Sequence, residues 1–124
     1  MSPRSQELMA AAQDRLAAAR AATQAGFDSA GASAAYYAML YAARAALSEQ
    51  DKNARTHSGT WALFRETFVA TGPFDAVLFA EAHRTQQLRE ATDYDAVMVP
   101  REEAERIVSL ADRFVSAIAK MLAS

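Results

Sequence analysis

The polar residues from Arg89 to Asp95 have the clearest potential for chemistry. Arg89, Asp93, Tyr94 and Asp95 cluster where an expected helix ends. An arginine fork can hold two phosphate oxygens at once, so the cluster could form a phosphate-binding site. Arg89 and Asp93 also stand four residues apart, which alone would give only a weak surface ion pair. From these residues both interpretations stay open.

A second polar segment, Arg55-Thr56-His57-Ser58-Gly59, precedes another expected helix. A Thr or Ser here can cap that helix, and the amides of a first turn are free to bind an anion. His57 either packs at the helix start or faces a phosphate-bearing ligand as a hydrogen-bond donor or acid–base group. Arg55 would then contribute to ligand binding.

Tyr36 and Tyr37 lie within a long alanine-rich segment. The simpler interpretation is that they pack in the core while their hydroxyl groups reach polar partners. The alternative is that this helix face lines a pocket, with Tyr37 contacting ligand, or forms a dimer seam. His83 and Arg84 are expected on a solvated helix surface.

Several classes of site are absent from the sequence. There is no cysteine, and the two histidines match no zinc-binding spacing such as HExxH, so we expect no metal site. Neither GxxxxGK[ST] nor GxGxxG occurs, and there is no GxSxG motif. Because these motifs are absent, we expect no cofactor. The net charge of −2 lacks the basic excess typical of duplex-DNA binders.

The hydropathy pattern argues against a membrane protein. No segment reaches the 18 or so apolar residues of a membrane-spanning helix. The polar start Met1-Ser2-Pro3-Arg4 lacks the apolar run of a signal peptide. We expect a cytoplasmic protein that makes no membrane contact.

Apolar periodicity and turn residues divide the chain into five helices. We expect them over residues 5–22, from 28 or 29 to 48, from 57 to 69, from Pro73, and from Pro100. Ser2 and Pro3 should begin the first helix, and the second should be the most buried. Val77 is expected on the apolar face of the fourth. The sequence predicts an all-α, up-and-down bundle of four or five helices forming one domain over residues 1–124.

Several short motifs together resemble the HEPN domain family, most closely its small stand-alone members. Their order along the chain carries the resemblance, which covers nearly the whole sequence. The motifs are Tyr36-Tyr37-Ala38-Met39, Ala42-Ala43-Arg44-Ala45-Ala46-Leu47, Thr56-His57-Ser58-Gly59, Leu63-Phe64, Phe68-Val69, Thr71-Gly72, Leu88-Arg89, Asp93-Tyr94-Asp95, Ala111 and Phe114-Val115.

The resemblance implies a helical bundle that is usually a homodimer. Many HEPN proteins are metal-independent RNases that act as toxins or in phage defence, often beside a minimal nucleotidyltransferase antitoxin. Their Arg-x(4–6)-His motifs meet at the dimer interface. Here the arginine would be Arg89, whereas Tyr94 stands near the histidine position. Because tyrosine has a reference pKa near 10, it is a poor base at neutral pH.

The leading hypothesis is a HEPN protein of a toxin–antitoxin or defence system, which binds nucleotide or RNA and works with a nucleotidyltransferase. Arg89, Asp93 and Tyr94 would form its site, with His57 nearby. One alternative is a metal-independent RNase that uses Arg89 with His57 or Tyr94, where His57 supplies the missing imidazole. Another is a non-catalytic adaptor module.

Overall fold

The structure, a computed structural model, describes the side chains of residues 1–90 and 96–124. Over this part of the chain it consists of five α-helices and one π-helical turn. The elements are α1 (Pro3–Gln24), α2 (Asp28–Ser48), α3 (His57–Phe64), η1 (Arg65–Val69), α4 (Ala76–Asp95) and α5 (Arg101–Ala123). The predicted all-α bundle is confirmed.

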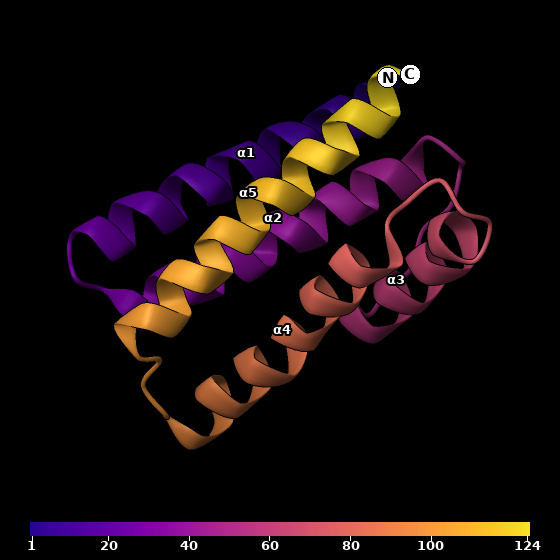
Figure 1. Ribbon diagram of the computed structural model, residues 1–124. Coiled ribbons are helices and arrows are strands. Elements are labelled where there is room, and N and C mark those ends of the chain that lie inside the picture. The colour runs from indigo at the N-terminus through magenta and orange to yellow at the C-terminus, as the bar shows by residue number, and fades with distance from the viewer.

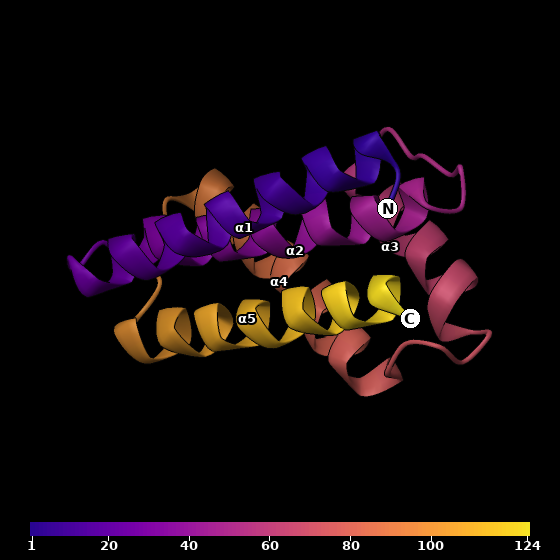
Figure 2. The same cartoon turned by 90° about the horizontal axis from the view of Figure 1, so that it is seen from above.

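The long helices lie side by side, and α2 is in the middle (Figure 1). Helix α1 packs along α2, and α5 lies against both. Helices α3 and α4 cover the remaining side of α2. Figure 2 shows both ends of the chain at the same end of the bundle.

Local capping explains where the helices begin. The Ser2 hydroxyl accepts a hydrogen bond from the Ser5 amide, and Pro3 occupies the first turn, as predicted. Thr56 Oγ1 accepts from the Gly59 amide at 2.9 Å, so capping of α3 is confirmed. The predicted start of α4 at Pro73 is wrong. Asp75 Oδ1 accepts from the Val77 and Leu78 amides, and α4 therefore begins at Ala76.

Helix α2 forms the centre of the core, as its sequence predicted. Most of its alanines are fully buried, and small side chains let the neighbouring helices approach closely. At Gly31 an added Cβ would lie 3.0 Å from Thr23 Cγ2 and 3.1 Å from the Ala19 carbonyl oxygen of α1. Glycine at this position therefore permits the contact between α1 and α2.

An aromatic cluster fills the space between α3, η1, α4 and α5. Phe64 stacks on Phe79 with ring centroids 5.9 Å apart, and Phe114 of α5 packs against Phe64 and Trp61. The predicted apolar face of α4 is wrong at Val77, which is 67% exposed because it lies in the first turn, away from this cluster. No helix in the described part of the chain is long and apolar enough to cross a membrane.

Candidate functional site

Arg89 of α4 lies against the two tyrosines of α2. Its guanidinium carbon is 5.4 Å from the ring centroid of Tyr36 and 5.5 Å from that of Tyr37. Both distances are within the range of a cation–π contact, and Tyr36 is almost completely buried. The two rings therefore form a rigid support that fixes the guanidinium at the surface, where Arg89 is half-buried.

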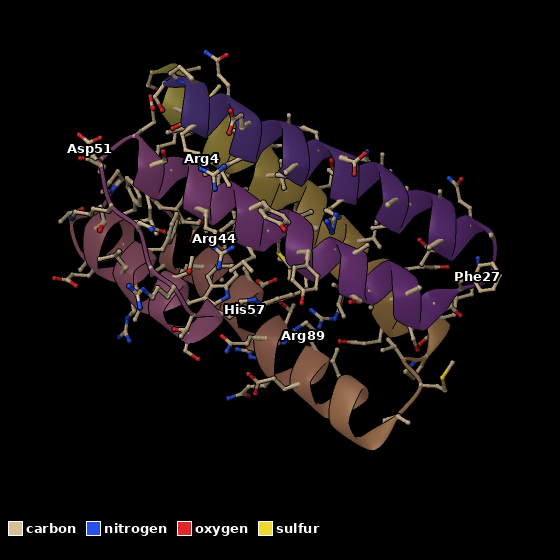
Figure 3. All side chains as sticks on the ribbon, turned by 180° about the vertical axis from the view of Figure 1, so that it is seen from behind. Arg4, Phe27, Arg44, Asp51, His57 and Arg89 are labelled. Carbon is tan, nitrogen blue, oxygen red and sulfur yellow. The ribbon has the colours of Figure 1, made fainter. Side chains whose placement is uncertain are left out.

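His57, the first residue of α3, contacts the same two rings. Its imidazole centroid is 5.8 Å from that of Tyr36 and 5.7 Å from that of Tyr37. The chain thus brings Arg89, His57 and Tyr37 together from three helices, although they are far apart in sequence. Figure 3 shows His57 and Arg89 adjacent on one face of the bundle.

The surroundings of His57 favour its neutral form. Burial lowers the pKa of the imidazole, and the positive charges of Arg89 and Arg44 lower it further, while Glu90 acts in the opposite direction. Neutral imidazole can accept a proton, so His57 has the protonation state that a general base needs at neutral pH.

Gln86 holds the beginning of α3 against α4. Its Nε2 atom donates to Ser58 Oγ at 2.9 Å and to Glu90 Oε1 at 3.0 Å. Gln86 is buried and lies three residues before Arg89, so both side chains are on one side of α4. This bridge fixes the position of His57 relative to Arg89.

Trp61 supports Tyr36, one of the two tyrosines that contact Arg89 and His57. Its indole Nε1 donates to the Tyr36 hydroxyl at 3.2 Å, and both side chains are buried. Burial raises the pKa of Tyr36, although the Trp61 hydrogen bond and Arg89 oppose this change. Tyr36 therefore remains a neutral phenol that packs in the core, as the simpler interpretation of the sequence predicted.

The sequence did not indicate the roles of Arg44, Gln86 and Glu90 at this site. Arg44 stands seven residues after Tyr37, which places the two on the same side of α2 after two turns. Gln86 stands three residues before Arg89, which places these two on the same side of α4. The helical spacing indicates which residues share a face of each helix. Only the packing of α4 against α2 shows which of these faces forms the candidate site.

The other predicted site residues do not all join this cluster. Arg55 lines a separate groove beside Arg44. The side chains of Asp93 and Tyr94 lie outside the described residues. His83 and Arg84 are exposed as predicted, with the His83 ring stacked on Trp61 at 6.0 Å.

The interior behind Arg89 has almost no free space. The gap between Arg89, Tyr36, Leu88 and Ile107 measures about 10 Å³, which is about room for one water molecule. A ligand must therefore approach from the outer side, where Tyr37 and His57 are half-buried. In the described part of the chain, no group of three His, Cys, Asp or Glu side chains could hold a metal ion.

Comparison with known proteins identifies the family to which this helical bundle belongs. The model of the HEPN domain matches residues 5–122, which includes every helix that contributes to the cluster. The chain belongs to the HEPN family. The family resemblance carried by the ordered sequence motifs is therefore confirmed.

Three known proteins are similar in sequence to this HEPN protein. "UPF0332 protein glr0978" of Gloeobacter violaceus is 30% identical over 99% of both chains. "Putative toxin MJ0605" of Methanocaldococcus jannaschii is 30% identical, covering 94% of this chain and 87% of the relative. "Putative toxin MJ0142" of the same organism is 32% identical over 72% of this chain, and the match spans only 61% of that protein. Two of these three relatives are thus named as putative toxins.

Proposed function

We propose that this HEPN protein is the toxin of a toxin–antitoxin or defence system, and that it binds RNA at the Arg89–His57 cluster. The observation that carries the proposal is the placement of a guanidinium and a neutral imidazole on the same pair of tyrosine rings. Arginine suits a phosphodiester because its planar fork matches two phosphate oxygens. The half-buried ring of Tyr37 offers a surface on which a base can stack.

The absence of space behind Arg89 supports a ligand that lies along the surface. A strand of RNA can place one phosphate on Arg89 while the rest of the strand follows the outside of the bundle. Arg44 adds a second positive charge near His57. This charge would attract the RNA backbone toward the cluster.

The lowered pKa of His57 favours cleavage as a second candidate function. Neutral His57 would take the proton of a ribose 2′-hydroxyl, and the 2′-oxygen would then attack the adjacent phosphorus. The phosphorus–5′-oxygen bond breaks, leaving a 2′,3′-cyclic phosphate, and water protonates the departing 5′-oxygen. Arg89 would hold the phosphate and stabilise its added negative charge. This reaction needs no metal ion.

The relatives named as toxins and the family resemblance support two partners. One is a second copy of this chain, which would bring two clusters together. The other is a minimal nucleotidyltransferase that acts as antitoxin. The single domain over residues 1–124 would be the unit that both partners contact.

RNA cleavage in the presence of EDTA tests the proposal. Purified protein is incubated with structured RNA and with tRNA, and products are separated on denaturing gels. For the cleavage candidate, we expect Arg89→Ala to abolish cleavage and His57→Gln to lower the rate by about 10²–10⁴-fold, the usual contribution of a general base. Arg84→Ala is the matched control, because Arg84 is an exposed arginine on α4 that is outside the cluster.

RNA binding is measured in parallel by fluorescence anisotropy. Binding that Arg89→Ala removes, without any cleavage, would support the binding function and reject the RNase. Failure of the wild-type protein to bind RNA at low salt would reject both. Thermal melting of each variant shows whether the loss reflects unfolding instead.

A further inference from the structure

A second feature, a groove beside the Arg89–His57 cluster, concentrates positive charge. It has a volume of about 460 Å³ and lies between the first turns of α1, the last turn of α2 and the loop over residues 49–56. Its charged lining residues are Arg4, Arg44, Lys52, Arg55 and Asp51. We call it the basic groove, because four cations face one carboxylate in a protein whose net charge is −2.

The charges of the basic groove are poorly compensated within the protein. Arg44 and Arg55 form no ion pair with any carboxylate among the residues that the structure describes. The Nε atom of Arg44 is buried and has no hydrogen-bond partner there. Lys52 donates to the neutral hydroxyl of Thr67, and among the described residues Arg4 pairs only with exposed Glu7. The groove can therefore bind an anion.

Glu49 directly follows α2 and is close in sequence to the groove, but its carboxylate is engaged elsewhere. Its Oε2 accepts hydrogen bonds from the Ser2 amide at 2.8 Å and from Ser5 Oγ at 2.7 Å. These bonds lower its pKa to about 2. They also tie the end of α2 to the start of α1, so both sides of the groove are held in place.

Arg44 connects the basic groove to the cluster. It lines the groove, and its charge also acts on His57. Figure 3 shows Arg4, Arg44, His57 and Arg89 following one another along one face of the molecule. Arg44 stands seven positions after Tyr37 in α2. At a rise of ~1.5 Å per residue they span about 10 Å.

This distance along α2 favours a strand of several nucleotides over a single nucleotide as the ligand. A stacked strand advances about 3.4 Å per nucleotide, so about three nucleotides span the distance along α2 from Tyr37, which Arg89 contacts, to Arg44, which lines the groove. No aromatic side chain is among the lining residues, so the groove offers no surface for stacking bases. Its contacts would be with backbone phosphates and would tolerate any sequence.

We infer that the basic groove binds the backbone phosphates of single-stranded RNA flanking the nucleotide held at Arg89 and His57. This inference rests on the proposed function, because it takes the RNA to be anchored at the cluster. Lys52 and Arg55 are exposed at the groove and contact the flanking phosphates, while Arg44 contacts the phosphate between the two sites. The groove thereby makes affinity depend on strand length.

The test compares a uridine dodecamer with a uridine dinucleotide by fluorescence anisotropy in EDTA over a range of salt concentrations. The wild type binds the dodecamer more tightly. In the double variant Lys52→Gln/Arg55→Gln this advantage shrinks. The slope of log K against log salt falls by about 1.4, or about 0.7 for each phosphate of a single strand that the variant no longer neutralises.

Arg65→Gln/Arg84→Gln is the matched control, because it removes two exposed arginines from a separate groove next to His83. It should keep both the length advantage and the salt slope. If Arg89→Ala weakens binding but the Lys52/Arg55 variant behaves like this control, the groove assignment is wrong and the proposed function survives. Equal affinity of the wild type for both oligomers would also overturn the assignment. Absence of RNA binding in the wild type would overturn both.

Discussion

Replacing Tyr36 by phenylalanine removes a single oxygen atom from the layer that supports Arg89 and His57. The lost oxygen accepts the hydrogen bond from Trp61 Nε1 at 3.2 Å, and the two side chains are 1% and 0% exposed. The variant leaves the indole N–H buried and without this partner, which costs about 1–3 kcal/mol. We expect the free energy of unfolding to fall by that amount.

The corresponding change in melting temperature follows from the size of the domain. An unfolding entropy of ~2.1 cal/mol/K per residue, applied to 124 residues, gives about 0.26 kcal/mol/K. A loss of about 1–3 kcal/mol therefore lowers Tm by about 4–12 °C. Because burial raises the pKa of Tyr36, the phenol stays neutral in the wild type, so the difference should not depend on pH around neutrality.

Urea unfolding followed by circular dichroism measures the loss, with Tyr37→Phe as the control. The Tyr37 hydroxyl has no hydrogen bond with any residue that the structure describes, and its ring is only half-buried. We expect Tyr37→Phe to change stability by less than about 0.5 kcal/mol, as for a typical surface substitution. If Tyr36→Phe were as stable as Tyr37→Phe, the reasoning about the buried Trp61–Tyr36 bond would be refuted.

Three further predictions concern stability. Because the folded-state pKa of His57 is lowered, the wild type should lose stability as pH falls below the usual histidine value of about 6.5, and His57→Gln should reduce that loss in thermal melts. Glu49→Gln should lower Tm at neutral pH, and its difference from the wild type should close between about pH 4.5 and 2, as the wild-type carboxylate becomes protonated; a constant difference would contradict this. Gly31→Ala should destabilise the protein by up to about 2 kcal/mol in urea, because the cost of crowding against Thr23 and the Ala19 carbonyl, about 1–3 kcal/mol, exceeds the ~1 kcal/mol gain in helix propensity.

The sequence predicted the helices well because their signals are local. Ser2-Pro3 and Thr56 cap helices through neighbours within three residues, and the apolar stripe of α5 repeats within a few turns. The start of α4 was misplaced because Pro73 and Asp75 are both good initiators. The competition between them depends on the Phe74 amide, which bonds back to the Phe68 carbonyl.

The candidate site was only partly predictable, because it depends on packing between distant segments. Arg89, His57 and Tyr37 could be chosen by residue type, but their common contact with Tyr36 needs the approach of α3 and α4 to α2. Arg89 and Tyr37 lie within their helices, and the site forms on a lateral face of the bundle.

The central claim is that Arg89 and His57 share one phosphate-binding site. The most direct test follows the imidazole resonances of His57 and His83 by NMR during a pH titration, with and without a short RNA that carries a 2′-methoxy group to prevent cleavage. In the free protein, Arg89→Ala should raise the pKa of His57, because Arg89 lowers it in the wild type. Bound RNA should also raise the pKa of His57 in the wild type, since a phosphate anion favours the imidazolium, while His83 should show little change. A His57 pKa unaffected by both Arg89→Ala and saturating RNA would contradict the claim.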